Sequence, residues 1–317
     1  MPGGGYIKPL DKILDIEVCK SISPNLKNTI TRLSTLLTFR VAVRELKFLT
    51  GLAVNHMMAK RITEEVGEIA LQITPEPVQF DSKEHLSIQA DGGRIRTIDG
   101  DGDGWKEVKT AIVAGQEKKL QVSRIQDHKT FMDGFCTTIK SHGYDSHIYG
   151  LNGVSDGAQW INDDLEERLP GLILVLDYYH FKEHLYETAE VLYPNDKVQI
   201  EEWVKTIKNL AFENKIDEIL NILSLEKQMQ DKNELAKESL RKLINYVQNN
   251  KHKITYGKFK ELGYEIGSGK IEATIKNTLD KRMKGASVRW QTFNAQKLLA
   301  LRDLYFNDQW DILSVKL

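Results

Sequence analysis

The run Leu172-Ile173-Leu174-Val175-Leu176 follows Pro170-Gly171 and ends at Asp177. Apolar and polar residues do not alternate in it, so it lacks the pattern of a strand with one face in water. A short, continuous apolar run is typical of a strand that is buried on both faces of a parallel sheet. The run therefore predicts an α/β fold in which Asp177 directly follows a buried strand.

The segments before this run predict the rest of the sheet. Three strands come first, followed by a helix, a fourth strand and a second helix. In chain order they are expected at residues 86–91 with a continuation to 96, 105–113, 120–125, 128–141, 147–154 and 158–168. Strands joined by short connections favour antiparallel pairing, whereas strands separated by helices favour parallel pairing. We therefore expect a mixed sheet with three antiparallel strands followed by parallel strands.

The connection between the first two strands, Asp99-Gly100-Asp101-Gly102-Asp103-Gly104, has the alternating acidic residues of a calcium-binding loop. An EF-hand loop that began at Asp99 would need an acidic final ligand, but Thr110 stands at that position. The flanking residues also have strand patterns and not helical ones. We therefore predict a hairpin loop.

Two segments interrupt the sheet pattern and suggest how the chain is divided. Thr74-Pro75-Glu76-Pro77 breaks a helical pattern, so we expect a helical N-terminal region at 1–75 and a catalytic domain at 76–317. A long polar region follows the apolar run, with apolar residues at helical spacing. We expect it to be a helical insertion at about 181–262.

The N-terminal region has the pattern of two short helices. Residues 41–51 predict a helix that ends at a glycine, and Asn55 is a good N-cap for a second helix over 56–70. Two short helices joined by such a turn fit a DNA-binding helix-turn-helix, with Lys60 and Arg61 on the second helix. An ordinary helical hairpin fits the same pattern.

Composition limits the function classes. The 317 residues include 44 Lys and Arg and 45 Asp and Glu, which gives a net charge of -1. DNA binding would therefore depend on local clusters of cations. Cys19 and Cys136 lack metal-site spacing and do not suggest a disulfide framework. No apolar run reaches membrane-spanning length and the first residues lack a signal-peptide pattern, so we expect a cytoplasmic protein with no membrane partner.

Three carboxylates are expected to meet at one edge of the sheet. Asp91 lies in the first strand and Asp156 just after the fourth, and open α/β sheets bind ligands at the carboxyl ends of parallel strands. Glu272 lies in the first turn of a helix that follows the turn Gly267-Ser268-Gly269. Singly, each Asp-Gly is more typical of a turn. Together the three carboxylates could hold two divalent cations, Mg²⁺ or Mn²⁺, about 4 Å apart for an in-line phosphoryl displacement.

The same motifs carry a family resemblance that covers roughly residues 85–305. They resemble motifs of bacterial insertion-sequence transposases of the DDE type, in the Kra-like and Lre-like groups. The motifs are Asp91-Gly92, Ser155-Asp156-Gly157-Ala158-x-Trp160-Ile161, Leu176-Asp177-Tyr178-Tyr179-His180, Gly267-Ser268-Gly269-x-x-Glu272, Trp105-Lys106-Glu107-Val108-Lys109 and Lys281-Arg282-Met283-Lys284-Gly285-Ala286-x-x-Arg289-Trp290. Lys270 and Ile271 stand where Pro and Val are expected.

This resemblance implies an RNase H-like fold with a helical insertion, and it implies that Asp91, Asp156 and Glu272 form the metal-binding triad. The implied activity is DNA cleavage and strand transfer. The implied partners are double-stranded DNA, both element ends and target, and further copies of the chain in a synaptic complex. The implied location is the bacterial cytoplasm.

His180 is a further candidate site residue, because Asp177-x-x-His180 matches the signature of the wider Mutator-related group. His180 could position a nucleophile or a phosphate, or it could be a partner of Asp177 outside direct contact with the metal. The stretch from His180 to His184 also has the H-x-x-E-H pattern of zinc peptidases, with Glu183 as the base. A third alternative is an inactive, transposase-derived DNA-binding protein.

The densest cluster of cations follows Glu272 and predicts where DNA is bound. It consists of Lys276, Lys281, Arg282, Lys284 and Arg289, with Trp290 beside it. On a regular helix that ends near Gly285, several of these cations can point the same way. Trp290 could then stack on an unpaired base. The alternative is a solvated helix with Trp290 in the core.

Overall fold

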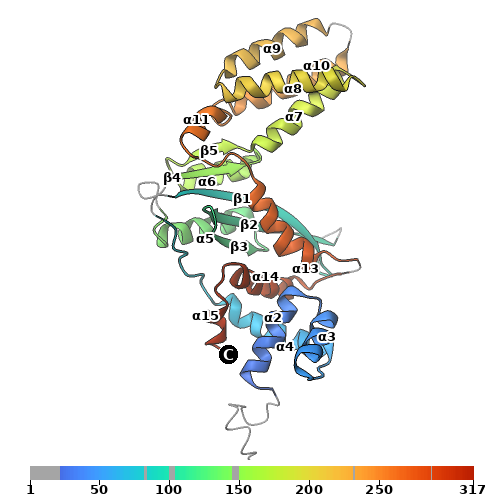
Figure 1. The fold of residues 1–317 in the computed structure, drawn as a ribbon, viewed down its shortest axis with the longest axis vertical. Coiled ribbons are helices and arrows are strands. Elements are labelled where there is room, and N and C mark those ends of the chain that lie inside the picture. The colour runs from blue at the N-terminus through green and yellow to red at the C-terminus, as the bar shows by residue number, and fades with distance from the viewer. Residues whose placement is uncertain (1–21, 82–83, 100–103, 145–149, 231–232, 287) are drawn as a thin grey trace, which may run out of the picture.

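The computed structural model describes residues 22–81, 84–99, 104–144, 150–230, 233–286 and 288–317. A sheet lies in the middle of an elongated molecule, with a group of helices beyond each end (Figure 1). One group combines the first and last described helices of the chain, and the other lies between the last strand and α12 (Gly269–Ile275). The sheet is therefore held between two helical regions.

Five strands of the described residues form one mixed sheet. They are β1 (His85–Arg96), β2 (Trp105–Ala114), β3 (Lys119–Arg124), β4 (Gly150–Ser155) and β5 (Ile173–Leu176), in the order β3-β2-β1-β4-β5. The pairs β1–β2 and β2–β3 are antiparallel, whereas β1–β4 and β4–β5 are parallel. The predicted α/β sheet, with antiparallel strands followed by parallel ones, is confirmed. The fourth strand was predicted at 147–154, and its first three residues lie outside the described residues.

The apolar run that defined the fold is buried from Leu174 to Leu176, with side chains in two cores as predicted, whereas Ile173 is 37% exposed. Leu174 packs in the core on the side of α5 and α6, whereas Leu176 packs in the core of the helical insertion. The run nevertheless lies at one end of the strand order. The chain beyond α10 protects this edge, because the Leu176 backbone N–H donates to the Lys253 carbonyl at 2.8 Å.

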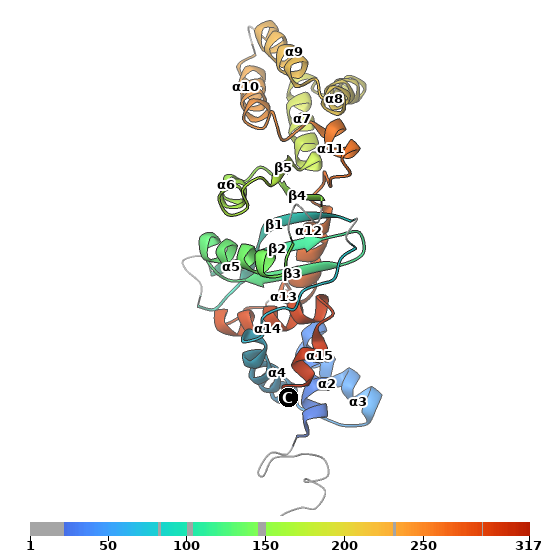
Figure 2. The same cartoon turned by 90° about the vertical axis from the view of Figure 1, so that its left-hand side faces the viewer.

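Helices cover both faces of the sheet. Figure 2 shows α5 (His128–Ser141) and α6 (Gln159–Arg168) on one side, and α12 with α13 (Lys281–Met283) on the other. Side chains of β1 alternate between these layers, so Ile88 packs towards α5 while Ile95 packs towards the helix of Leu279. Gly93 allows that helix to lie close to β1, because a Cβ there would overlap the Leu279 side chain.

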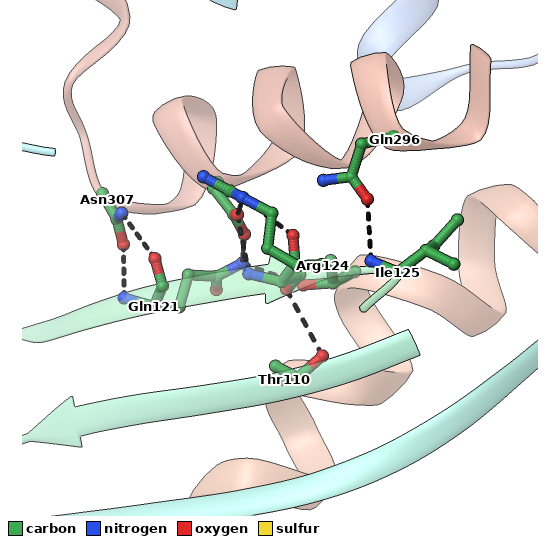
Figure 3. Close-up of polar contacts among 9 residues, drawn as sticks. Thr110, Gln121, Arg124, Ile125, Gln296 and Asn307 are labelled. Atoms are coloured by element: carbon green, nitrogen blue, oxygen red, sulfur yellow. Dashed lines mark hydrogen bonds and ion pairs between the residues drawn. The ribbon is translucent and has the colours of Figure 1, made fainter. Parts of the chain in front are cut away.

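The outer edge of β3 is capped by side chains of α14 (Thr292–Phe306) and the residue after it (Figure 3). Gln296 and Asn307 accept hydrogen bonds from the backbone N–H groups of Ile125 and Gln121, both at 2.7 Å. Asp303 accepts from the N–H of Ser123 at 2.8 Å. These three acceptors satisfy alternate N–H groups of an edge strand, which would otherwise be open to pairing with another chain.

The N-terminal helices are α2 (Pro24–Leu36), α3 (Phe39–Thr50) and α4 (His56–Leu71). The predicted pair 41–51 and 56–70 is confirmed as α3 and α4. The chain turns at Gly51 with φ +74°, and the Asn55 side chain caps α4 by accepting from Met57 N at 2.8 Å. These helices share a core with α14 and with α15 (Trp310–Ser314). The proposed boundary at residue 75 therefore separates segments that pack against each other.

The predicted helical insertion contains α7 (Tyr178–Leu192), α8 (Lys197–Phe212), α9 (Ile216–Met229), α10 (Glu234–Asn249) and α11 (Tyr256–Glu261). Their apolar faces form a common core, which continues into β5 through Val175 and Leu176. Because that core reaches the sheet, the insertion is fixed next to the carboxyl ends of the parallel strands.

Other sequence expectations have mixed outcomes. Cys136 is a free, buried cysteine on α5, while Cys19 and the loop tip at 100–103 lie outside the described residues. Strands flank that loop tip, as expected for a hairpin and not for an EF-hand. In the part of the chain that the structure describes, no helix is long and apolar enough to cross a membrane.

Candidate functional site

The register of the parallel strands brings Asp91 and Asp156 together. Gln89 of β1 pairs with Val154 of β4, and both strands run in the same direction. Two residues further along, Asp91 and Asp156 therefore occupy equivalent positions at the carboxyl end of β4. β4 ends at Ser155 while β1 continues to Arg96, so Asp91 lies where β1 extends beyond its neighbour.

Gln89 also fixes the start of α12, the helix that carries Glu272. Its side-chain amide donates to the Gly267 carbonyl at 3.3 Å and accepts from Ile271 N at 3.0 Å. Side chains two residues apart on a strand share a face, so Asp91 lies on the face that α12 covers. The structure therefore brings the three predicted carboxylates to one edge of one face of the sheet.

The neighbouring carboxylates affect the protonation of Asp91. Partial burial raises the pKa of Asp91, and the negative charges of Asp156, Glu272 and Glu107 raise it further. A hydrogen bond from Gly92 N opposes this shift. A carboxylate whose pKa is raised by neighbouring negative charges favours either a proton or a nearby cation.

Asp177 and Ser268 connect α7 to the helix of Glu272. Asp177 is buried and caps α7 by accepting from Tyr179 N and His180 N, both at 3.2 Å. It also accepts from Ser268 N at 3.0 Å and from the Ser268 hydroxyl at 2.9 Å. The same hydroxyl is 2.5 Å from Glu272 Oε1. Because a hydroxyl has one proton, Ser268 can donate to only one of the two carboxylates at a time.

His180 lies in the first turn of α7, beside Asp177, with its side chain 43% exposed. Its Nδ1 is 3.5 Å from Glu183, and its ring contacts that of His184 with centroids 5.4 Å apart. His184 in turn lies 3.2 Å from Glu187. The predicted His-x-x-Glu-His residues thus share a helix, but each histidine is directed to a glutamate of its own helix.

Among the residues that the structure describes, no three His, Cys, Asp or Glu side chains are gathered closely enough to hold a metal ion as they stand. The zinc-peptidase alternative therefore lacks a third ligand within this part of the chain. The charges of Asp156 and Glu272 act on Asp91, but the three carboxylates do not form a closed metal site. Hard oxygen donors of like charge fit Mg²⁺ or Mn²⁺, which would offset the repulsion.

Tyr246 of α10 was not predicted as a site residue. Its ring lies against Gly157, because a Cβ at Gly157 would be 3.7 Å from Tyr246 Cε2 and 4.0 Å from its hydroxyl. Burial raises the pKa of Tyr246, and the charges of Asp177 and Asp156 raise it further. No local pattern predicts this contact, because the sequence of α10 shows only an amphipathic helix.

Arg282 and Trp290 correct the predicted DNA-binding face. Arg282 is 5% exposed and Trp290 8%. The Arg282 guanidinium lies between the rings of Phe39 and Trp290, at 4.9 and 5.2 Å, and donates to the Ser34 carbonyl. The Trp290 indole donates to the Met283 carbonyl at 3.1 Å. The alternative with Trp290 in the core is therefore confirmed, and Arg282 joins it there.

The helix after Glu272 is also irregular, which explains the error. Residues Lys276–Asp280 form a π-helical segment, η1, between α12 and α13. The i→i+5 bonds of a π-helix change which residues share a face, so α-helical spacing misplaces the residues that follow. Burial lowers the pKa of Arg282 to about 10, in keeping with its place in the core.

The other predicted cations are exposed. Lys276, Lys281, Lys284 and Arg289 lie at the surface, and Lys284 pairs with Asp280 at 2.8 Å. On α4, Arg61 is exposed and Lys60 is partly exposed, 3.7 Å from Glu64. These side chains can reach a polyanion, but they lie on two separate parts of the molecule.

Comparison with known proteins gives one limited similarity. No protein-family model matches the chain. A segment of 85 residues is 34% identical to a "UPF0236 protein in vanSb 3'region" from Streptococcus gallolyticus. The match covers 26% of this chain and 19% of the length of that relative. The chain is therefore similar to this protein over a short segment only.

Proposed function

We propose that this chain is the transposase of an insertion sequence, with an RNase H-like catalytic domain. The observation that carries the proposal is geometric: the strand register puts Asp91 and Asp156 at equivalent positions, and Gln89 holds the start of the Glu272 helix on the same face of the sheet. A mixed sheet with a helical insertion after its last strand is the arrangement that the motif resemblance implies. The similarity to a UPF0236 protein agrees with a transposase-related chain.

In this proposal Asp91, Asp156 and Glu272 would hold two Mg²⁺ or Mn²⁺ ions, and such ions would supply Lewis-acid stabilisation of the oxygens that gain charge in the reaction. Water attacks the phosphorus in cleavage, and the bond to the 3′ oxygen breaks to give a 3′-hydroxyl. In strand transfer that hydroxyl attacks a target phosphodiester and releases another 3′-hydroxyl. His180, half-exposed at the same edge, orients the nucleophile or a phosphate.

The exposed cations at Lys276, Lys281, Lys284 and Arg289 bind the phosphates of the DNA near the cut. A separate contact by Lys60 and Arg61 on α4 would bind DNA away from the cut, as a helix-turn-helix does. Assembly of several copies on paired element ends, and work in the bacterial cytoplasm, belong to the same proposal. Phosphate contacts of this kind would make the affinity fall as salt rises.

A nicking assay tests this proposal. The substrate is DNA that carries the flanking element ends, incubated with Mg²⁺, Mn²⁺ or EDTA. We expect cleavage with either cation, none with EDTA, and none by Asp91→Asn, Asp156→Asn or Glu272→Gln, because all three carboxylates are needed to hold the ions. Glu187→Gln is the matched control, since it removes an exposed carboxylate outside the cluster.

His180→Ala in the same assay separates catalysis from binding. We expect the cleavage rate to fall more than the DNA affinity. DNA binding by a wild-type chain that never cuts, with every cation, would instead identify an inactive DNA-binding protein.

A further inference from the structure

The hydroxyl of Tyr246 lies at an unusual place for a phenol of the helical insertion. It is buried and has no hydrogen-bond partner among the described residues. Its ring packs on the ring of His184, with centroids 4.4 Å apart, and its edge faces Gly157. A buried donor without an acceptor is unfavourable, so such a group in a folded protein needs an explanation.

The nearby carboxylates can be tested one by one as acceptors for this hydroxyl. Asp177 already accepts four hydrogen bonds, two on each oxygen, from Tyr179, His180 and Ser268. Glu183 has a side chain that is 70% exposed and directed to His180. Asp177 is thus fully occupied, and Glu183 points into solvent.

Asp156 differs from both. Its Oδ1 accepts from Ala158 N at 2.8 Å, while its Oδ2 has no hydrogen bond within the described part of the chain. Asp156 directly precedes Gly157, against which the Tyr246 ring lies. Gly157 has φ +94°, which favours glycine and leaves the space that the ring uses. Asp156 is therefore the carboxylate that has an oxygen free to accept and that directly precedes the residue against which the Tyr246 ring lies.

We propose that Tyr246 is a positioning residue: its hydroxyl, which has no partner in this structure, donates to Asp156 Oδ2 when the carboxylate turns towards it, and so sets the orientation of this carboxylate for metal binding. The inference rests on the proposed function, because it concerns Asp156 as a ligand. It makes the helical insertion part of the site: α10 supplies a donor that fixes a carboxylate of the sheet. Groups that orient metal ligands in this way typically change metal affinity by about 10- to 100-fold when removed.

The structure offers a matched control in Tyr256. Its hydroxyl is also buried and without a partner among the described residues, and it belongs to the same core. Its ring packs on Tyr178 and Phe181, away from Gly157. Tyr246→Phe and Tyr256→Phe therefore remove equivalent hydroxyls that differ in their access to Asp156.

The experiment measures Mn²⁺ binding by electron paramagnetic resonance for the wild type, both tyrosine variants and Asp91→Asn, with thermal unfolding in parallel. We expect Tyr246→Phe to bind Mn²⁺ about tenfold more weakly. We expect Tyr256→Phe to bind like the wild type, and both variants to unfold at no lower temperature than the wild type. Asp91→Asn should lose the binding.

The outcomes separate the two proposals. If the wild type binds Mn²⁺ and Tyr246→Phe binds it as tightly as Tyr256→Phe does, the role of Tyr246 is overturned while the proposed function stands. If the wild type binds no Mn²⁺, or Asp91→Asn binds it unchanged, the proposed metal site is overturned and the inference with it. If both tyrosine variants bind Mn²⁺ more weakly than the wild type and by the same factor, the inference is also overturned. The loss of affinity would then come from poorer packing of the helical insertion and not from the Tyr246 hydroxyl.

Discussion

Two carboxylates in different regions of this molecule, Asp303 and Asp91, have opposite surroundings. Asp303 on α14 is buried, and its oxygens accept from Gln121 Nε2, Ser123 N and Arg124 Nη1 at 2.8–3.0 Å. Asp91, at the edge of the sheet, accepts from Gly92 N and otherwise faces the negative charges of Asp156 and Glu272. One carboxylate is surrounded by donors and the other by like charges.

The pKa shifts show what the difference means. Burial raises the pKa of both groups, but the neighbours of Asp303 lower its pKa while the charged neighbours of Asp91 raise it further. The hydrogen-bonding capacity of Asp303 is met within the protein, because Arg124 and the edge of β3 supply its donors. Asp91 has one donor, Gly92 N, and like charges for its other neighbours, so its ionised form costs stability; in the proposed function a cation would offset that cost.

The largest effect is expected for Asp303→Ala. This change removes the ion-pair partner of Arg124 and leaves the Ser123 N–H without its acceptor, so we expect a loss of about 3 to 5 kcal/mol in the free energy of unfolding. Urea unfolding followed by circular dichroism measures it. Asp91→Asn in the same experiment should show no loss. Equal losses for the two variants would remove the distinction between a structural and a functional carboxylate.

The second effect concerns Arg282, which the sequence assigned to DNA and the structure assigns to the core. Arg282→Ala removes a buried charged hydrogen bond to the Ser34 carbonyl, so we expect a loss of about 1.5 to 3 kcal/mol in the free energy of unfolding. Lys281→Ala, an exposed neighbour, should change stability by less than about 0.5 kcal/mol.

In DNA binding, the expected order of the two variants is reversed: Lys281→Ala has an effect and Arg282→Ala has none. Lys281→Ala should reduce the salt dependence of DNA binding. With one phosphate contact fewer, binding of the variant releases fewer counterions from the DNA. Arg282→Ala, measured below its unfolding temperature, should leave the salt dependence unchanged. A reduced salt dependence with Arg282→Ala alone would return this residue to the DNA surface.

Ser268 lies between the two kinds of carboxylate, since it contacts the satisfied Asp177 and the open Glu272. Ser268→Ala leaves Asp177 with three N–H donors but removes the donor of Glu272. We therefore expect Mn²⁺ affinity to fall by about tenfold with little change in stability. Thr274→Val, which removes a hydroxyl from the same helix on the side of Lys119, is the control. Wild-type affinity in Ser268→Ala would limit its hydroxyl to capping.

The sequence predicted what depends on local periodicity. The helix expected at 128–141 is α5, and the strand expected at 105–113 is β2 with one further residue. Asp91, Asp156 and Glu272 were predicted together because the ends of parallel strands meet. Arg282 was misplaced because a π-helical segment changes the face of the helix, and Tyr246 was missed because no local pattern reports a contact between α10 and the end of β4.

The smallest expected effect is a pH-dependent change in the free energy of unfolding, caused by the ionisation of Asp91. Its pKa is raised in the folded chain, so the folded state binds this proton more tightly than the unfolded chain does. The ionised carboxylate therefore lowers stability at neutral pH. The cost disappears below the ordinary value of 3.8, where both states hold the proton. Asp91→Asn keeps the oxygen that accepts from Gly92 N and removes the charge.

We therefore expect Asp91→Asn to be slightly more stable than the wild type near pH 7, with a difference that shrinks towards zero as the pH falls to about 3.5. Urea unfolding of the two proteins across this range, in a buffer without divalent cations, measures the difference. Asp99→Asn provides a control of opposite sign, because hydrogen bonds from Thr292 lower the pKa of Asp99. A difference that stays constant with pH, or an Asp91→Asn variant that is less stable at pH 7, would mean that Asp91 is held by donors as Asp303 is. The cation-binding role would then lose its physical basis, since a carboxylate that is already satisfied gains little from a metal ion.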